Sequence, residues 1–352
     1  MNVNIKNKRV GIACNFFGLS GGMERYSVDI AKEFVSRGYR VIVYTKKVDS
    51  KFKHDIGVEI RLCPCGLLPG KLQPLFFSKW LERCKNEVDI MIGCCRTAAA
   101  DLYICGGTHL GFLRAIQKSP KWYDNLFVDL ESQAYTNARI IVAHSPLMSQ
   151  ELQDFYSVDA SKIVIAYPPV EGNCFNVSSF EQNQLLRAKF GLDNEKKHFL
   201  FVSSSHERKG YPLLEKYFSQ TDLPIDLLVV GRPIHSECDH IRYLGYRKDI
   251  EDLYKATDFT ILASSYEPFG LVAIESVLSG KPVVLSDKIG CCAAISNAAK
   301  TTFTAGDLNS LDRAIRSVLQ SSSYCCSSND VYSPTSVSEH VDVLERLTRK
   351  FN

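Results

Sequence analysis

Glu267 and Glu275 stand eight positions apart, separated by a Pro-Phe-Gly turn and an apolar run that reads as the start of a helix. Carboxylates accept hydrogen bonds from vicinal diols. The amides of Phe269, Gly270 and Leu271 would lie at the helix N-terminus and can face an anion. The more ordinary interpretation is a glutamate that complements the helix dipole and a second one exposed to solvent. We expect a polar cradle for a ligand rich in hydroxyls and phosphate.

A pair of cations, Arg208 and Lys209, follows an apolar stretch at 199–202 that reads as a buried strand. The pair would lie at the carboxyl end of that strand, followed by Gly210. Arginine offers a planar fork and lysine a compact charge, and both suit a diphosphate. Taken alone, such a pair is more often a solvent-exposed turn. Together with the two glutamates it favours a nucleotide-sugar site.

Gly21 and Gly22 follow the first expected strand, 10–14, and open the first expected helix. Glycine allows close backbone approach, and the positive end of a helix dipole attracts anions. An ordinary strand-to-helix turn would show the same residues. The segment lacks the G-x-G-x-x-G spacing and a suitably placed acidic residue, so an NAD-linked oxidoreductase is disfavoured.

Two further strand ends carry single residues of interest. His109 follows the expected strand 102–105 after two glycines, although a lone histidine is more often structural. Tyr246 follows the short strand 241–244 and would stack on or frame a base, with a surface turn as an equal alternative.

The composition is that of an ordinary globular protein, with 45% hydrophobic and 23% charged residues. At about 150 residues per domain, 352 residues suggest two domains. The net charge of +3 argues against a nucleic-acid binder. No apolar stretch is long enough to span a bilayer. The thirteen cysteines include adjacent pairs at 94–95, 291–292 and 325–326, which suit reduced thiols better than a zinc site.

Apolar strands and amphipathic helices alternate along both halves of the chain, which predicts an α/β protein with two Rossmann-like, doubly wound domains facing a cleft. Ligands would bind at the carboxyl ends of the strands. We expect an N-terminal acceptor-side domain at 1–170 and a nucleotide-sugar-binding domain at 171–328. A final helix within 329–352 is expected to pack back on the N-terminal domain.

The chain resembles family 4 retaining glycosyltransferases of the GT-B fold over nearly its whole length. The Glu-x7-Glu segment with its Pro-Val-Val continuation is the most specific part. Within the family the chain looks most like the lipopolysaccharide-core glucosyltransferases. The other matching segments are 21–26, 106–109, 142–145, 201–210, 244–246 and 249–258.

The resemblance implies roles at the donor diphosphate. Arg208 and Lys209 would hold the diphosphate, and Gly21 and Gly22 would approach it. Many relatives carry arginine where this chain has Ser204, so the diphosphate would depend more on the two cations.

The resemblance also implies roles at the donor's sugars. Glu275 would bind the ribose hydroxyls. Glu267 and the three amides that follow it would hold the donor hexose, and His109 would lie near the reacting sugar.

The activity implied is transfer of a hexose, with retention, from a nucleoside diphosphate sugar such as UDP-glucose to a saccharide acceptor. The acceptor would be lipopolysaccharide core or another cell-envelope glycan, and the enzyme would be cytoplasmic or peripheral at the inner face of the cytoplasmic membrane. Neither a cofactor nor a metal is expected, because the chain has no Asp-x-Asp and the cations fill the electrostatic role. The alternatives are a transferase acting on a soluble glucan or small acceptor, and an inactive nucleotide-sugar-binding module.

The segment 110–130 mixes apolar and aromatic residues with three cations, Arg114, Lys118 and Lys121. This composition suits an element that touches anionic lipid. An acceptor-side helix packed on the core is an equal alternative.

Overall fold

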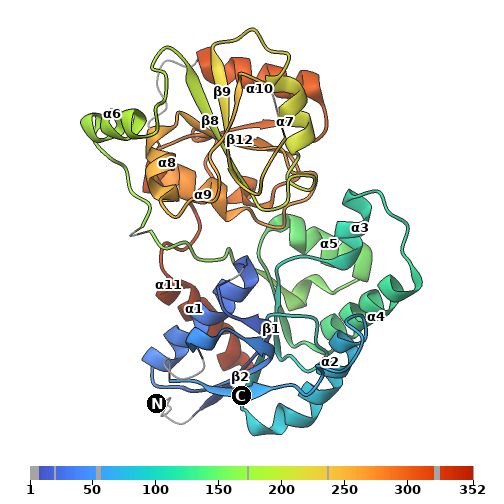
Figure 1. Ribbon diagram of the computed structural model, residues 1–352. Coiled ribbons are helices and arrows are strands. Elements are labelled where there is room, and N and C mark those ends of the chain that lie inside the picture. Colours follow the sequence, from blue (N-terminus) through green and yellow to red (C-terminus); the bar gives the residue numbers. More distant parts are fainter. Residues whose placement is uncertain are drawn as a thin grey trace. The chain divides into compact units, whose positions relative to one another are not determined.

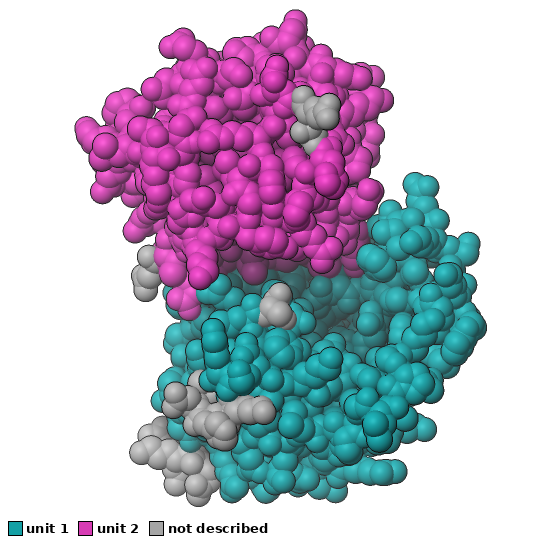
Figure 2. Space-filling view, in the orientation of Figure 1, with its two compact units in different colours: residues 1–169, 336–352 teal, residues 170–335 magenta. Residues whose placement is uncertain are grey.

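The chain folds into two compact units in a computed structural model. The described residues are 8–19, 21–52, 57–172, 174–235, 238–320 and 326–351. Unit 1 comprises Met1–Pro169 and Ser336–Asn352, and unit 2 comprises Val170–Thr335 (Figure 2).

Unit 1 contains a seven-stranded sheet with the order β3-β2-β1-β4-β5-β6-β7. All of its strand pairs are parallel, so the carboxyl ends of the strands share one edge. Its strands are β1 (Arg9–Phe17), β2 (Arg40–Val48), β3 (Glu59–Leu62), β4 (Ile90–Gly93), β5 (Leu102–Cys105), β6 (Ile140–Ala143) and β7 (Ile163–Ile165). Its helices are α1 (Gly22–Ser36), α2 (Gln73–Cys84), α3 (His109–Ala115), α4 (Trp122–Asn137), α5 (Pro146–Tyr156) and α11 (Val337–Thr348).

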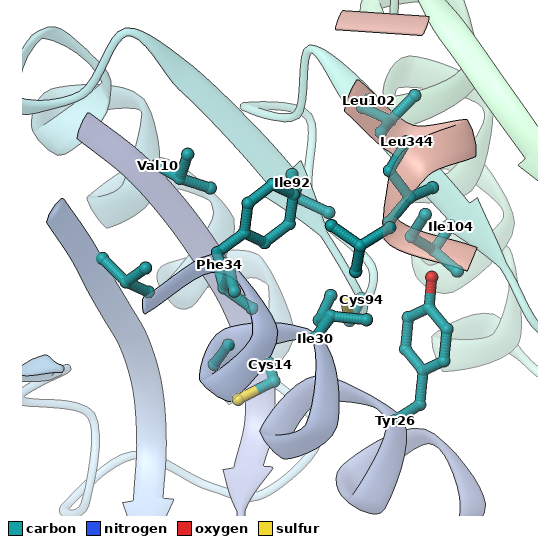
Figure 3. Packing of buried hydrophobic residues seen from close by; sticks show 14 of the residues in the cluster. Val10, Cys14, Tyr26, Ile30, Phe34, Ile92, Cys94, Leu102, Ile104 and Leu344 are labelled. Carbon is teal, nitrogen blue, oxygen red and sulfur yellow. The ribbon is translucent and has the colours of Figure 1, made fainter. Parts of the chain in front are cut away.

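The sheet of unit 1 has an apolar core on each face. On one face α1 and α11 pack together over the sheet. Leu344 of α11 belongs to one buried cluster with Phe34 and Ile30 of α1 and with sheet residues such as Ile92 and Ile104 (Figure 3). On the other face the buried side chains of α2 pack against Ile42 and Tyr44 of β2 and against Cys95, which follows β4. Because both faces are covered, the central strands read as continuous apolar runs rather than alternating ones.

The last helix, α11, is attached to α1 by polar contacts as well as by the core. Ser336 caps its N-terminus by accepting a hydrogen bond from the Glu339 amide. Arg37, just after α1, pairs with Asp342 at 2.6 Å. Inside the core the hydroxyl of Tyr26 lies 2.8 Å from Nε2 of His340.

Unit 2 contains a six-stranded parallel sheet with the order β10-β9-β8-β11-β12-β13. Helices α7 and α10 pack together on one side, and α8 packs with α6 and α9 on the other (Figure 1). The strands are β8 (Lys197–Ser203), β9 (Ile225–Gly231), β10 (Ile241–Tyr243), β11 (Phe259–Leu262), β12 (Val283–Ser286) and β13 (Lys300–Phe303). The helices are α6 (Phe180–Lys189), α7 (Tyr211–Phe218), α8 (Ile250–Ala256), α9 (Leu271–Leu278) and α10 (Leu308–Gln320).

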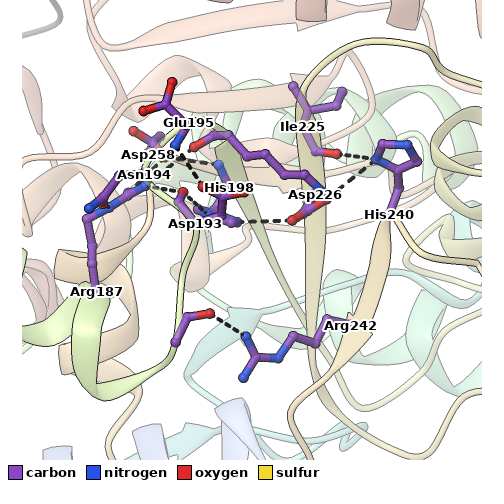
Figure 4. A network of polar contacts seen from close by, with 12 residues as sticks. Arg187, Asp193, Asn194, Glu195, His198, Ile225, Asp226, His240, Arg242 and Asp258 are labelled. Carbon is purple, nitrogen blue, oxygen red and sulfur yellow. Dashed lines mark hydrogen bonds and ion pairs between the residues drawn. The ribbon is translucent and has the colours of Figure 1, made fainter.

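The amino end of the unit 2 sheet is held by a polar network around Arg187 of α6 (Figure 4). The Arg187 guanidinium donates to Asp258 and to the Ala256 carbonyl, each at 3.1 Å, and to the side chain of Asn194 at 3.0 Å. Asp258 also accepts from the His198 amide at 2.9 Å. These hydrogen bonds satisfy a charged group that is almost fully buried, which would otherwise be costly.

The prediction of two doubly wound α/β units is confirmed. The elements that the sequence interpretation did not identify include α2, α5, β3 and β13. Strands β3 and β13 form sheet edges and are half-polar, so they lack the apolar run that marks a central strand.

We predict that acid destabilises unit 1 through two buried histidines. Burial lowers the pKa of His144 to about 3 and that of His340 to about 4, from an ordinary 6.5. Between pH 6.5 and 4 the unfolded chain therefore binds more protons, and stability falls as the pH falls. The two groups together contribute a slope of at most about 2.7 kcal/mol per pH unit.

The measurement is urea unfolding across this pH range, compared with the double variant His144→Phe/His340→Gln. Glutamine keeps a partner for the Tyr26 hydroxyl but does not titrate here. The variant should show a shallower pH dependence, and an unchanged slope would contradict the assignment.

Candidate active site

The strand order of unit 2 places its predicted site residues at one point of the sheet. Strands β8 and β11 are neighbours, and the chain order reverses direction between them. Arg208 and Lys209 follow β8, and Glu267 follows β11. In open α/β sheets ligands bind at this reversal, outside the carboxyl ends of the strands.

The predicted cations and carboxylates of unit 2 meet at this edge. Nη1 of Arg208 lies 3.0 Å from Oε2 of Glu267 and 3.1 Å from the Tyr266 carbonyl oxygen. The ammonium of Lys209 donates to the Val202 carbonyl at 3.3 Å. Burial lowers the pKa of Lys209, and the nearby carboxylates of Glu267 and Glu275 oppose that shift. The site therefore holds two cations close to two carboxylates.

Gly210 fixes the turn that presents these cations. It adopts a left-handed backbone conformation with φ of 77°, as the residue before α7. A Cβ at this position would lie 2.0 Å from the Ala263 carbonyl oxygen. Only glycine fits there, so the loop after β8 packs directly on the loop after β11.

The loop that carries Glu267 is held by the segment after β12. The backbone of Glu267 forms an isolated parallel bridge with Ile289, and the Cys291 amide donates to the Phe269 carbonyl at 2.8 Å. Gly270 precedes α9 with φ of 99°, which a larger residue would strain. The loop therefore aims the first amides of α9 toward the carboxyl edge of the sheet.

Glu275 lies in the second turn of α9 and is held by a tyrosine from α8. The Tyr254 hydroxyl donates to Oε2 of Glu275 at 2.7 Å. Burial raises the pKa of Tyr254 and the Glu275 carboxylate raises it further, so this hydroxyl stays protonated and remains a donor. Ser204 and Tyr246 are both exposed, and no contact within the described chain joins either to this cluster.

In unit 1 the α1 N-terminus lies near the strand end that carries His109, because the Met23 side chain packs against Gly106. The carboxylate of Glu24 folds back over this terminus, and a Cβ on Gly21 would meet it at 2.5 Å. A Cβ on Gly22 would meet nothing within 4 Å. An incoming anion would therefore have to displace Glu24.

The His109 ring is engaged at both nitrogens. Its Nε2 lies 2.8 Å from Asp124 and its Nδ1 lies 3.4 Å from the Arg96 guanidinium. Its backbone amide donates to Glu131 at 2.9 Å. The histidine is buried, so the ring would reach a sugar only after one of these partners moved.

Several residues that build the site were not singled out from the sequence. Arg96 follows β4, at the point where the strand order of unit 1 reverses, and that position was a usable signal. Tyr254 and the segment 288–291 offered no local signal, because their contacts depend on tertiary packing.

Comparison with known proteins identifies the family. A model described as Glycosyltransferase Family 4 matches residues 20–172, and one described as Glycosyl transferases group 1 matches residues 182–328. The curated protein named "Probable transglycosylase" of Burkholderia thailandensis is 41% identical over 315 residues, covering 88% of this chain and 87% of that protein. The chain belongs to glycosyltransferase family 4.

Solved structures show that this glycosyltransferase has the GT-B fold. WaaG, a glycosyltransferase involved in lipopolysaccharide biosynthesis, is 18% identical with a TM-score of 0.75, covering 89% of this chain and 91% of WaaG. Anabaena HepE in complex with UDP and glucose is also 18% identical, with a TM-score of 0.73, and covers 97% and 99% of the two chains. These similarities support the fold alone.

Two further features of the described residues concern metal binding and membrane crossing. No three His, Cys, Asp or Glu side chains converge there as a metal site would require. None of the described helices is long and apolar enough to cross a membrane.

We predict that Gly22→Ala separates folding from activity. Alanine fits into open space and favours helix over glycine by up to about 1 kcal/mol, so the melting temperature should stay the same or rise. If the donor diphosphate approaches this backbone, glycosyl transfer should fall at least about tenfold because the added methyl group blocks it.

The matched control is Gly66→Ala, because a Cβ at Gly66 also meets nothing within 4 Å but lies in the loop after β3. Full activity of Gly22→Ala would contradict a role for Gly21 and Gly22 at the diphosphate.

Proposed function

We propose that this glycosyltransferase moves a hexose, with retention, from UDP-glucose or a similar nucleoside diphosphate sugar to a saccharide acceptor. The observation that carries the proposal is the cluster at the carboxyl edge of unit 2. It places Arg208, Lys209 and the first amides of α9 beside two carboxylates. The complex of HepE with UDP and glucose supports a UDP-linked hexose as the donor.

The cations have an electrostatic role in this proposal. As the glycosidic bond breaks, negative charge develops on the departing diphosphate, and Arg208 and Lys209 stabilise it without reorganising. Glu267 and the amides after it hold the hexose, and Glu275, oriented by Tyr254, accepts hydrogen bonds from the ribose hydroxyls. The acceptor attacks the same face that the diphosphate leaves, and a leaving-group oxygen takes the acceptor's proton.

In this proposal the His109 ring lies near the reacting sugar, after it exchanges its contact with Arg96 for one with the sugar. The reaction proceeds without a metal, because fixed cations supply the charge stabilisation. Ser204 and Tyr246, being exposed at the same edge of unit 2, remain available to the diphosphate and the base.

We propose a lipid-linked cell-envelope glycan, such as lipopolysaccharide core, as the acceptor. The fold shared with WaaG supports this branch. The enzyme would act in the cytoplasm, peripherally at the inner face of the cytoplasmic membrane.

Donor binding provides the first test. We expect UDP-glucose to raise the melting temperature more than glucose alone does, because selective binding stabilises the fold by mass action. Glu275→Gln should weaken UDP-glucose binding about tenfold or more by removing a charge-assisted hydrogen bond. Glu207→Gln, an exposed glutamate in the Arg208 loop, is the control and should bind normally.

Activity is then followed as free glucose released without an acceptor and as transfer to a supplied glycan. Arg208→Gln should lower the rate roughly 10²–10³-fold. Binding without any release of sugar would favour an inactive binding module. Loss of turnover on chelation, restored by one divalent ion, would overturn the metal-independent mechanism.

A membrane contact is supported by exposed side chains on α3 and α4. Trp122 is 67% exposed and Phe112 is 36% exposed, and the cations Lys118 and Lys121 lie in the exposed segment between them. The ammonium of Lys71 lies 3.8 Å from the Tyr123 ring centre, adding a further cation beside this segment. Apolar side chains flanked by lysines suit a surface of anionic lipid.

We predict that vesicles containing phosphatidylglycerol retain the protein and that neutral phosphatidylcholine vesicles do not. Trp122→Ala and the double variant Lys118→Gln/Lys121→Gln should each reduce co-sedimentation several-fold, while Lys216→Gln on α7 should not. Equal sedimentation with both vesicle types, or none with either, would count against this contact.

A further inference from the structure

Lys46 is a cation at the carboxyl end of β2, and it has no partner among the residues that the structure describes. Its side chain leaves the strand on the same face as Ile42 and Tyr44, which pack in the core beside α2, because side chains alternate along a strand. Lys46 is only partly buried, and it makes no hydrogen bond or ion pair with any residue in the described ranges.

Arg96 is a second cation at this edge, and its guanidinium is held firmly on one side. Its Nε donates to Glu131 at 2.6 Å, its Nη2 lies 3.4 Å from Nδ1 of His109, and its carbon centre lies 5.6 Å from the Phe127 ring. The side chain is 36% exposed, and Nη1 has no partner within the described part of the chain. The arrangement presents unused N–H groups that are already oriented.

The carboxylates of this neighbourhood are turned inward or already bound. Glu131 is 1% exposed and accepts hydrogen bonds from Arg96, the His109 amide and the Tyr156 hydroxyl. Asp124 accepts from the His109 ring and from the Lys121 amide. Glu24 lies over the α1 N-terminus. Both cations can therefore offer donors to a ligand, while Glu131 and Asp124 are already engaged and Glu24 is turned toward the α1 N-terminus.

The sheet order brings the two cations within reach of one ligand. Strand β1 lies between β2 and β4, so their carboxyl ends are roughly 10 Å apart. Burial raises the pKa of the Cys95 thiol to about 12, and the charges of Lys46 and Arg96 both oppose this rise. Both cations therefore lie near enough to the buried Cys95 sulfur for their charges to lower its pKa.

We propose that Lys46 and Arg96 bind a negatively charged group on the acceptor, a phosphate or a carboxylate. The inference rests on the proposed function and adds the chemical class of the acceptor. The donor diphosphate has its own cations, Arg208 and Lys209 in unit 2, and this leaves the unit 1 pair for a second anion. An arginine fork and a lysine suit both anionic groups.

The test uses glucose 6-phosphate, glucuronate and glucose as probes with a phosphate, a carboxylate and no charge. Their binding to the full chain is titrated by ligand-observed NMR, with and without saturating UDP. We expect wild type with UDP bound to prefer one or both charged probes to glucose by at least about tenfold. Comparing the two charged probes shows which anionic group is preferred.

Lys46→Gln should abolish most of that preference and leave UDP binding unchanged. Lys47→Gln, an exposed neighbour on β2, is the matched control. Arg96→Gln should act like Lys46→Gln, whereas Arg96→Lys should keep part of the preference. Because Arg96→Gln removes a partner of buried Glu131, its folding is checked by circular dichroism, and Lys46→Gln decides the question if Arg96→Gln fails to fold.

Two results would overturn the inference, namely equal binding of the three probes to wild type or a preference that survives Lys46→Gln. Failure of UDP to bind would instead contradict the proposed donor. Since the effect of Lys46→Gln is read with and without UDP, the anion site is tested in either case.

Discussion

The reversal of strand order inside each parallel sheet is the constraint on which the candidate site depends. At this point the loops that follow two neighbouring strands run to opposite faces of the sheet. They leave a crevice between them where residues at the strand ends can face a ligand. In unit 2 this point carries Arg208 and Glu267, and in unit 1 it carries Gly22 and Arg96. Most of the polar groups assigned to the donor or acceptor lie at or beside one of these points, and the buried strands behind them supply the rigidity.

Much of the fold could be predicted because the central strands are apolar runs and α1 shows the spacing of apolar residues expected of a helix. The prediction of one site that includes Arg208 and Glu267 followed from each of them coming after a strand, but their ion pair was not predicted. The edge strands β3 and β13 were missed because solvent contact gives them a mixed pattern that local periodicity does not distinguish from a loop.

A site residue was predictable from the sequence only where it follows a strand directly, because such a residue lies at the carboxyl edge of the sheet. The contact between Arg96 and Glu131 joins residues 35 positions apart, and the hydrogen bond from Tyr254 to Glu275 joins residues 21 apart. Neither pairing leaves a local pattern. The position of His109 after a strand was apparent from the sequence. Its ring contacts were not, because they involve Arg96 and Asp124 from two other segments.

The attachment of α11 to α1 has a consequence for how the chain is made. Val341, Leu344 and Leu347 complete the core of unit 1, yet they follow the whole of unit 2 in the chain. Unit 2 is continuous in sequence from 170 to 335, so it is translated in full before α11. The first 169 residues therefore keep one apolar face uncovered until the ribosome has translated unit 2 and α11.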